Sequence, residues 1–211
     1  VGLDKKISLK SIIIFTLPTM STMIFLSLYT IVDGVFISRY VGAQALSATN
    51  IVYPVINLVL GVSIMMSTGG SAIVAMLLGE KREKKARSIF TSLTIVVFFI
   101  GILISVFCNL FIKNIIYLAG STEDLYFYCY DYLSITLYFV PVAILKTYFD
   151  YFLVTAGRPE LGLLNGIIGG ITNMILDYIF IVPLKLGVKG AALATQMGMI
   201  IPVLISLSYF I

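Results

Sequence analysis

The chain has 211 residues, of which 60 % are apolar and only 11 % are charged, with a formal net charge of +4. A soluble domain carries about 25 % charged residues, so this chain has too little polar surface to face water, and the lipid bilayer is the environment that suits it. Histidine and tryptophan are absent, which excludes His-based metal sites and Ser-His-Asp triads. We expect neither enzymatic activity nor a cofactor. The basic residues form short clusters between uncharged runs, not the stripe that binds nucleic acid.

Six apolar runs are long enough to cross a bilayer, which takes about 20 helical residues. Charged and turn-forming residues mark their borders. The expected transmembrane helices are residues 11–37, 45–78, 88–112, 125–154, 161–181 and 190–211. The sequence therefore predicts an all-α integral membrane protein built as a six-helix transmembrane bundle. Adjacent glycines at Gly69 and Gly70 leave a re-entrant hairpin in the second run as an alternative.

The distribution of Lys and Arg predicts the orientation, because cytoplasmic loops carry the excess of positive charge. With the amino terminus inside, nine basic residues lie in cytoplasmic segments and four in outer segments. We therefore expect a multi-pass plasma-membrane protein with both ends in the cytoplasm. The chain starts at Val1 and stops within an apolar run at Ile211, so we expect it to be part of a longer protein.

Ionisable side chains inside a span are costly, about 2.5–3.5 kcal/mol each on insertion scales. Lys146 and Asp150 are four residues apart, and an ion pair along one helix face near the cytoplasmic end of the fourth run explains both. Asp131 lies among tyrosines near the outer end of that run, where an interfacial aromatic belt explains it.

Asp33 and Asp177 have no cation three or four residues away on their own helices. Each lies six residues from the outer border of its run, which at about 1.5 Å per residue places both carboxylates at roughly the same depth. Asn173 lies one turn from Asp177 on the same helix face, and Thr195 on the sixth run reaches a similar depth. Four oxygen-bearing side chains from three helices are thus predicted to meet in one layer.

Oxygen ligands are those that hard cations prefer, so Na+ is one candidate for this layer. A proton is the other, because burial and like-charge repulsion disfavour two ionised carboxylates side by side. A hydrogen-bonded cluster that only joins helices is the structural alternative. Pro18, about two turns into the first run, removes a backbone donor, and it predicts either a static kink or a hinge.

Several segments together resemble multidrug and toxic compound extrusion (MATE) transporters, in order and over nearly the whole chain. They are VDGVFI at 32–37, YVG at 40–42, 69–79 with the basic loop after it, TAGRPE at 155–160, Asn173 with LDYIFI at 176–181, and GVKGAALAT at 187–195. Pro18 also matches the proline of that family's first helix.

The resemblance implies twelve helices in two six-helix lobes, with this chain as the amino-terminal lobe and a second lobe absent from it. It implies an antiporter, which we expect in a bacterial plasma membrane, that exports lipophilic cationic compounds as Na+ or H+ enters. The cation site of the family falls on Asp33, Asn173, Asp177 and Thr195. Candidate walls of a substrate cavity, which suit cations through charge and cation–π contact, are Phe25, Tyr29, Met65 and Met199.

Two other functions remain open at this stage. A lipid-linked saccharide flippase of the same superfamily would need basic residues to hold a pyrophosphate, and Lys146 is the one basic residue within a predicted span. A non-transporting membrane scaffold would tolerate replacement of the four-residue polar layer.

Overall fold

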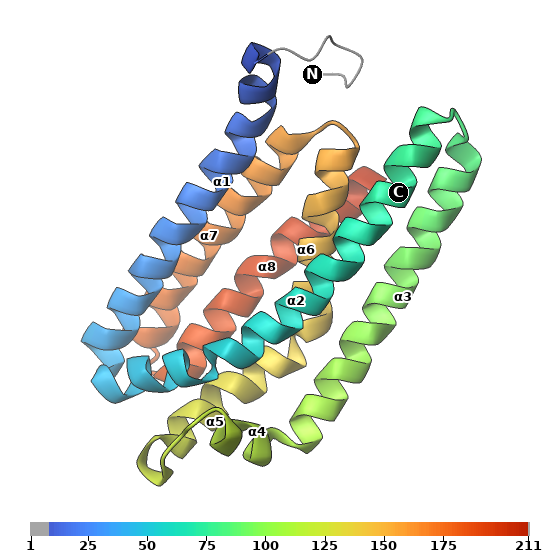
Figure 1. The fold of residues 1–211 in the computed structure, drawn as a ribbon. Helices are drawn as coiled ribbons and strands as arrows, with labels where there is room; N and C mark the ends of the chain where they lie inside the picture. Colours follow the sequence, from blue (N-terminus) through green and yellow to red (C-terminus); the bar gives the residue numbers. More distant parts are fainter. Residues whose placement is uncertain (1–8, 211) are drawn as a thin grey trace.

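The computed structural model describes residues 9–210, except for the side chains of 9–11, Ile14, Phe15, Pro18, Thr19, Thr22 and Leu26. The described residues are almost entirely helical (Figure 1). The elements are α1 (Leu9–Phe36), the π-helix η1 (Ile37–Val41), α2 (Ala43–Gly79), α3 (Glu83–Leu110), α4 (Ile112–Leu118), α5 (Glu123–Tyr138), α6 (Val140–Thr155), α7 (Pro159–Ile181) and α8 (Val188–Phe210).

Over the described residues, five helices are long and apolar enough to span a membrane. The α5–α6 pair, bent by 58° at its break, makes a sixth if it is one span. A helix satisfies its own backbone hydrogen bonds, which is why long apolar runs fold this way in lipid. The second run is a continuous helix through Gly69 and Gly70, so the re-entrant alternative was wrong.

The fourth predicted span differs from a single helix. It breaks at Phe139, two residues before Pro141. Proline lacks an N–H and disfavours helical geometry in the residue before it, so the two halves turn relative to each other. The bend is held by close packing, because a Cβ added to Gly101 of α3 would come within 2.8 Å of the Pro141 Cα.

The helices form two packed groups. In the first, α7 lies between α1 and α8, and in the second, α2 packs against α3, α5 and α6. Contacts of α8 with α5 and α6 join the groups. An aromatic cluster packs at this junction. The ring centroids of Phe90 and Phe210 are 4.7 Å apart, and those of Tyr148 and Phe152 are 4.4 Å apart. The Tyr148 hydroxyl also donates a hydrogen bond to the Phe90 carbonyl oxygen.

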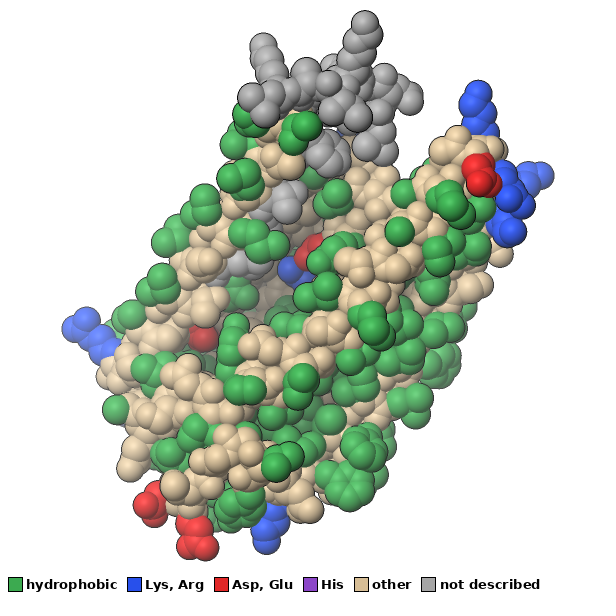
Figure 2. Space-filling model, viewed as in Figure 1, with side chains coloured by type: hydrophobic (Ala, Val, Ile, Leu, Met, Phe, Trp, Pro, Cys, Tyr) green, Lys and Arg blue, Asp and Glu red, His purple; other side chains and the backbone are tan. Residues whose placement is uncertain are grey.

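Charge is segregated along the long axis of the molecule. Figure 2 shows apolar side chains over the sides of one face and charged side chains at its two ends. It also shows a hollow between α1 and α2 with a few charged side chains inside it. The end with the amino terminus also carries the α2–α3 loop and the α6–α7 loop (Figure 1). This separation fits an apolar belt between two aqueous boundaries.

Candidate functional site

A polar layer lies within the group formed by α1, α7 and α8. Asp33 is in the last turn of α1, Asn173 and Asp177 are on consecutive turns of α7, and Thr195 is on α8. Asp177 and Asn173 are 0 % and 2 % exposed. The carboxyl groups of Asp33 and Asp177 lie close enough to interact directly, and Asn173 lies within range of Asp177. The structure therefore brings these four side chains together.

Thr195 links this layer to the backbone of α8. The Asn173 amide nitrogen donates to the Thr195 hydroxyl oxygen at 3.3 Å, and the hydroxyl donates to the Ala191 carbonyl oxygen at 3.1 Å. The amide nitrogen keeps a second N–H, which can face the Asp177 carboxylate.

Oxygen atoms without partners dominate the layer. Six buried side-chain atoms of the described residues have no hydrogen-bond partner, and all six are oxygens. Four of them belong to the layer: one Asp33 carboxylate oxygen, the Asn173 amide oxygen and both Asp177 carboxylate oxygens. Buried polar atoms are nearly always satisfied, so a group that donates or carries positive charge is expected here. Such an oxygen set suits Na+, and its two carboxyl groups equally suit a proton.

Glycines bring the three helices close enough for these contacts. A Cβ added to Gly198 on α8 would lie 2.9 Å from the Gly169 carbonyl oxygen on α7 and 3.2 Å from the Asn173 Cβ. On the other side of α7, the Phe25 ring of α1 occupies the space beside Gly170. These small residues thus set the distances between the polar side chains.

A partly open cavity continues from this layer toward the middle of the bundle. Its lining includes Tyr29, Asn173, Thr195 and Met199. Centres of water-sized molecules occupy about 40 Å³ of it, which is room for about three waters. The Asn173 and Thr195 side of the layer therefore borders a cavity that has room for water.

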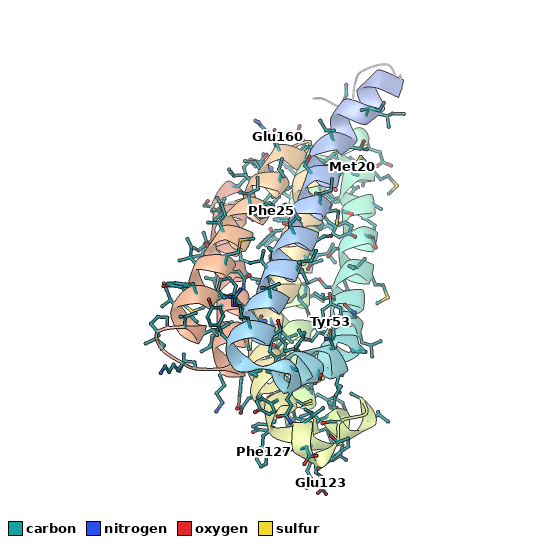
Figure 3. The ribbon with its side chains drawn as sticks, turned by 90° about the vertical axis from the view of Figure 1, so that its left-hand side faces the viewer. Met20, Phe25, Tyr53, Glu123, Phe127 and Glu160 are labelled. Atoms are coloured by element: carbon teal, nitrogen blue, oxygen red, sulfur yellow. The ribbon has the colours of Figure 1, made fainter. Side chains whose placement is uncertain are left out.

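Of the residues predicted to line a substrate cavity, only some line the cavity seen in the structure. Tyr29 and Met199 line the cavity, whereas Phe25 packs against Gly170 and is not among the lining residues. Figure 3 shows Phe25 midway along α1. Met65 on α2 is 68 % exposed and outside this cavity. The backbone of Pro18 lies within α1, and its side chain lies outside the described residues.

Three polar residues near this cavity were not part of the predicted site. Lys146 and Asn165 line it, and the Asn165 amide donates to the Ser206 hydroxyl at 2.8 Å. Gln196, adjacent to Thr195, is 3 % exposed, and its side-chain oxygen has no partner among the described residues. Asn165 lies eight residues before Asn173, within one stripe of a helix, so helical periodicity could have identified it.

The one charged pair predicted outside the layer is present, and Asp131 has a partner that was not predicted. Lys146 Nζ and Asp150 Oδ2 are 2.7 Å apart, which confirms the pair along one helix face. Asp131 is paired with Lys189 at 3.3 Å, with both side chains substantially exposed. No group of three or more His, Cys, Asp or Glu residues that could hold a metal ion occurs among the described residues.

The comparisons with known proteins agree with this geometry. A model of the MatE family matches residues 18–179. The multidrug export protein MepA of Staphylococcus haemolyticus is 28 % identical over 206 residues, covering 95 % of this chain and 44 % of the relative. The probable multidrug resistance protein YoeA of Bacillus subtilis is 23 % identical over 204 residues, with the same two coverages.

A solved structure supports the fold. It is described as the outward-facing conformation of a multidrug resistance MATE family transporter of the MOP superfamily. The match covers 95 % of this chain and 44 % of the chain in that structure, with a TM-score of 0.89 and 24 % sequence identity. This chain spans about half the length of the curated relatives it matches. The prediction of an all-α membrane fold that forms one lobe of a transporter is confirmed. Since the family model covers most of the chain, the protein belongs to the MatE family of transporters, and the chain corresponds to an amino-terminal lobe.

Proposed function

We propose that the full-length protein is a secondary active antiporter that exports lipophilic, cationic, drug-like compounds while Na+ or H+ enters. Asp33, Asn173, Asp177 and Thr195 form the site for the coupling cation in this proposal. The relatives named as multidrug export or resistance proteins support the export function. The family is one of transporters, so the residues of the site bind and release ions and perform no covalent chemistry.

One observation carries the proposal: two carboxyl groups from separate helices meet in a buried layer whose oxygens lack partners. A layer that only joined helices would satisfy these atoms within the protein. The four unpartnered oxygens favour an exchangeable cation instead.

The coupling cation enters from the outer side in our proposal. Asp33 lies three residues before the end of α1 and Asp177 four residues before the end of α7. With the amino terminus in the cytoplasm, both helix ends are outer ends. Binding there removes the repulsion between the carboxylates and shifts α1 relative to α7, with Pro18 as the hinge. The cation drives this change only as far as its affinity differs between the two states.

The test uses the full-length protein in vesicles loaded with a fluorescent lipophilic cation, under a Na+ gradient or a pH gradient applied separately. Wild-type protein exports the dye under one of the two gradients. Asp33→Asn abolishes that gradient-driven export. Asp131→Asn is the matched control, because Asp131 lies at the surface outside the layer, and it exports normally.

Normal coupled export by Asp33→Asn would refute the assigned site. Absence of export by wild-type protein under both gradients would refute the antiporter, and lipid-linked sugars would then be tested as cargo of a flippase.

A further inference from the structure

A second polar pair lies below the cation layer, formed by Asn165 of α7 and Ser206 of α8. The Asn165 amide donates to the Ser206 hydroxyl at 2.8 Å, and the two residues are 1 % and 2 % exposed. Asn165 lines the same cavity as the layer residues Asn173 and Thr195. Its amide oxygen has no hydrogen-bond partner among the described residues. Buried polar atoms are nearly always satisfied, so a water or a cation is expected beside this oxygen.

The cavity extends along α7 from the depth of the layer toward the amino-terminal end of that helix. Asn165 and Asn173 are eight residues apart, about 12 Å along the helix axis, and three glycines of α7 line the cavity between them. Asn165 lies six residues after Pro159, the first residue of α7, which is about 9 Å from that end. With the amino terminus in the cytoplasm, this end of α7 is the inner one. The cavity therefore leads from the cation layer toward the cytoplasm.

The size of the cavity suits water and a small ion, not a drug-sized molecule. It has room for about three waters. Close packing keeps it narrow, because Gly169 and Gly198 approach each other closely and the Phe25 ring fills the space beside Gly170. Uncharged oxygen groups at its two ends can bind a monovalent cation and still release it, as conduction requires.

One cation of the protein also lines this cavity, and its charge is offset. Lys146 reaches the cavity from α6, and its ammonium is 2.7 Å from the Asp150 carboxylate. The pair has no net charge, so its repulsion of a passing cation is largely cancelled.

We propose that this cavity is the inner exit route of the coupling cation, and that Asn165 and Ser206 form its inner site, the last binding site before the cytoplasm. After the cation leaves the carboxylates, the waters of the cavity carry it toward Asn165. The amide oxygen there is a ligand for Na+, and it also accepts a hydrogen bond from a protonated water. This inference rests on the proposed antiport and adds a second site to it.

A hydrogen bond that only joins α7 to α8 is the alternative explanation of the pair. Ser63 offers a matched case of such a joint, because it is 0 % exposed and its hydroxyl donates to the Ile144 carbonyl oxygen of α6 at 3.1 Å. Ser63 is not among the residues that line the cavity. Comparison of the two joints therefore separates ion release from helix packing.

The first experiment follows export of a fluorescent lipophilic cation by the full-length protein in vesicles, under a Na+ gradient or a pH gradient applied separately. Asn165→Leu removes the amide and keeps a similar shape. We expect it to lower the maximal export rate about tenfold, under the gradient that drives the wild type. The affinity of the purified protein for the coupling ion, measured by calorimetry, should stay within about twofold of wild type, because the layer is intact. Ser206→Ala should also slow export, and the control Ser63→Ala should not.

An unchanged export rate in Asn165→Leu would overturn the exit route. An equal loss in Ser63→Ala would also overturn it, since any lost joint between helices would then suffice. A loss of ion affinity as large as the loss of rate would assign Asn165 to the cation layer instead.

The second experiment does not depend on export. In a cysteine-free background of the full-length protein, Asn165→Cys is treated from the cytoplasmic side of inside-out vesicles with small cationic or anionic thiosulfonates. The cationic reagent should react about tenfold faster, because the route favours positive charge. The control is Asn109→Cys on α3, where the native amide bonds within its own helix, and it should show no such preference.

Absence of reaction at Asn165→Cys from the cytoplasmic side, or equal rates for the two reagents, would overturn the exit route whatever the export assay shows. If the wild-type protein exports no dye under either gradient, the antiport proposal fails, and the labelling rates alone decide on the route.

Discussion

At the scale of single residues, one hydroxyl connects the cation layer to the next helix. Thr195 accepts from the Asn173 amide and donates to the Ala191 carbonyl oxygen. Thr195 takes one N–H of the Asn173 amide, which leaves the second N–H and the amide oxygen available to the layer. Thr195 thus acts on the layer by orienting Asn173 as well as by offering its own oxygen.

Thr195→Val keeps the shape of the side chain and removes the hydroxyl. A neutral hydrogen bond contributes about 1 kcal/mol, so the coupling-ion concentration for half-maximal export should rise about fivefold. Thr195→Ser keeps the hydroxyl and should stay near the wild-type value. The measurement is the export rate of the full-length protein against the concentration of the coupling ion. An unchanged half-maximal concentration in Thr195→Val would show that the hydroxyl is not needed.

The sequence was sufficient to place Asp33, Asn173, Asp177 and Thr195 at one depth, because straight helices convert residue number into height with little error. Their use by a cation is a separate prediction that the binding and export experiments test. Lys146 was predicted to pair with Asp150 along one helix face, and the structure contains that pair.

At the scale of helices, backbone contact between α7 and α8 determines where the polar side chains lie. Gly169 and Gly198 approach each other so closely that each added Cβ would lie 2.9 Å from the other residue's carbonyl oxygen. Small residues such as Gly169 favour close packing, but their partner on α8 is a tertiary contact that no spacing within one helix specifies.

Gly198→Ala should therefore destabilise the full-length protein by about 1–3 kcal/mol, the usual cost of overpacking, and lower the melting temperature of the purified protein. Gly69→Ala is the matched control, because a Cβ added to Gly69 meets nothing within 4 Å. That control should be neutral or slightly stabilising, since alanine favours helix over glycine. Equal melting temperatures for the two variants would contradict the proposed contact.

The bend between α5 and α6 shows a second limit of the sequence. The run from 125 to 154 is apolar enough to read as one span, and Pro141 alone predicts a static kink. A turn of 58° needs space on its inner side, which Gly101 of α3 provides by its approach to Pro141. The size of the bend thus depends on a residue about forty positions away.

At the scale of the whole molecule, α1 is the least enclosed of the long helices. It packs on α7 and η1, and large apolar side chains along it, among them Leu17, Met23, Ile24 and Ile31, are more than half exposed. In water such a surface would be unfavourable, whereas lipid or a second lobe can cover it. Because α1 is held mainly by one neighbour, the proposed shift of α1 relative to α7 disturbs few contacts with the other helices.

The two ends of the molecule can be assigned to the two sides of the membrane by labelling. Glu123 and Glu160 are exposed and lie at opposite ends of the bundle (Figure 3). Glu160 lies at the end with the amino terminus, where the basic loop between α2 and α3 is also found. The excess of basic residues predicts that this end is cytoplasmic.

In a cysteine-free background of the full-length protein, a membrane-impermeant maleimide should therefore label Glu123→Cys in intact cells. Glu160→Cys should be labelled only after the cells are permeabilised. The reverse pattern would invert the topology and would place Asp33 and Asp177 at the cytoplasmic side, so that the coupling cation could not enter the site from outside as proposed.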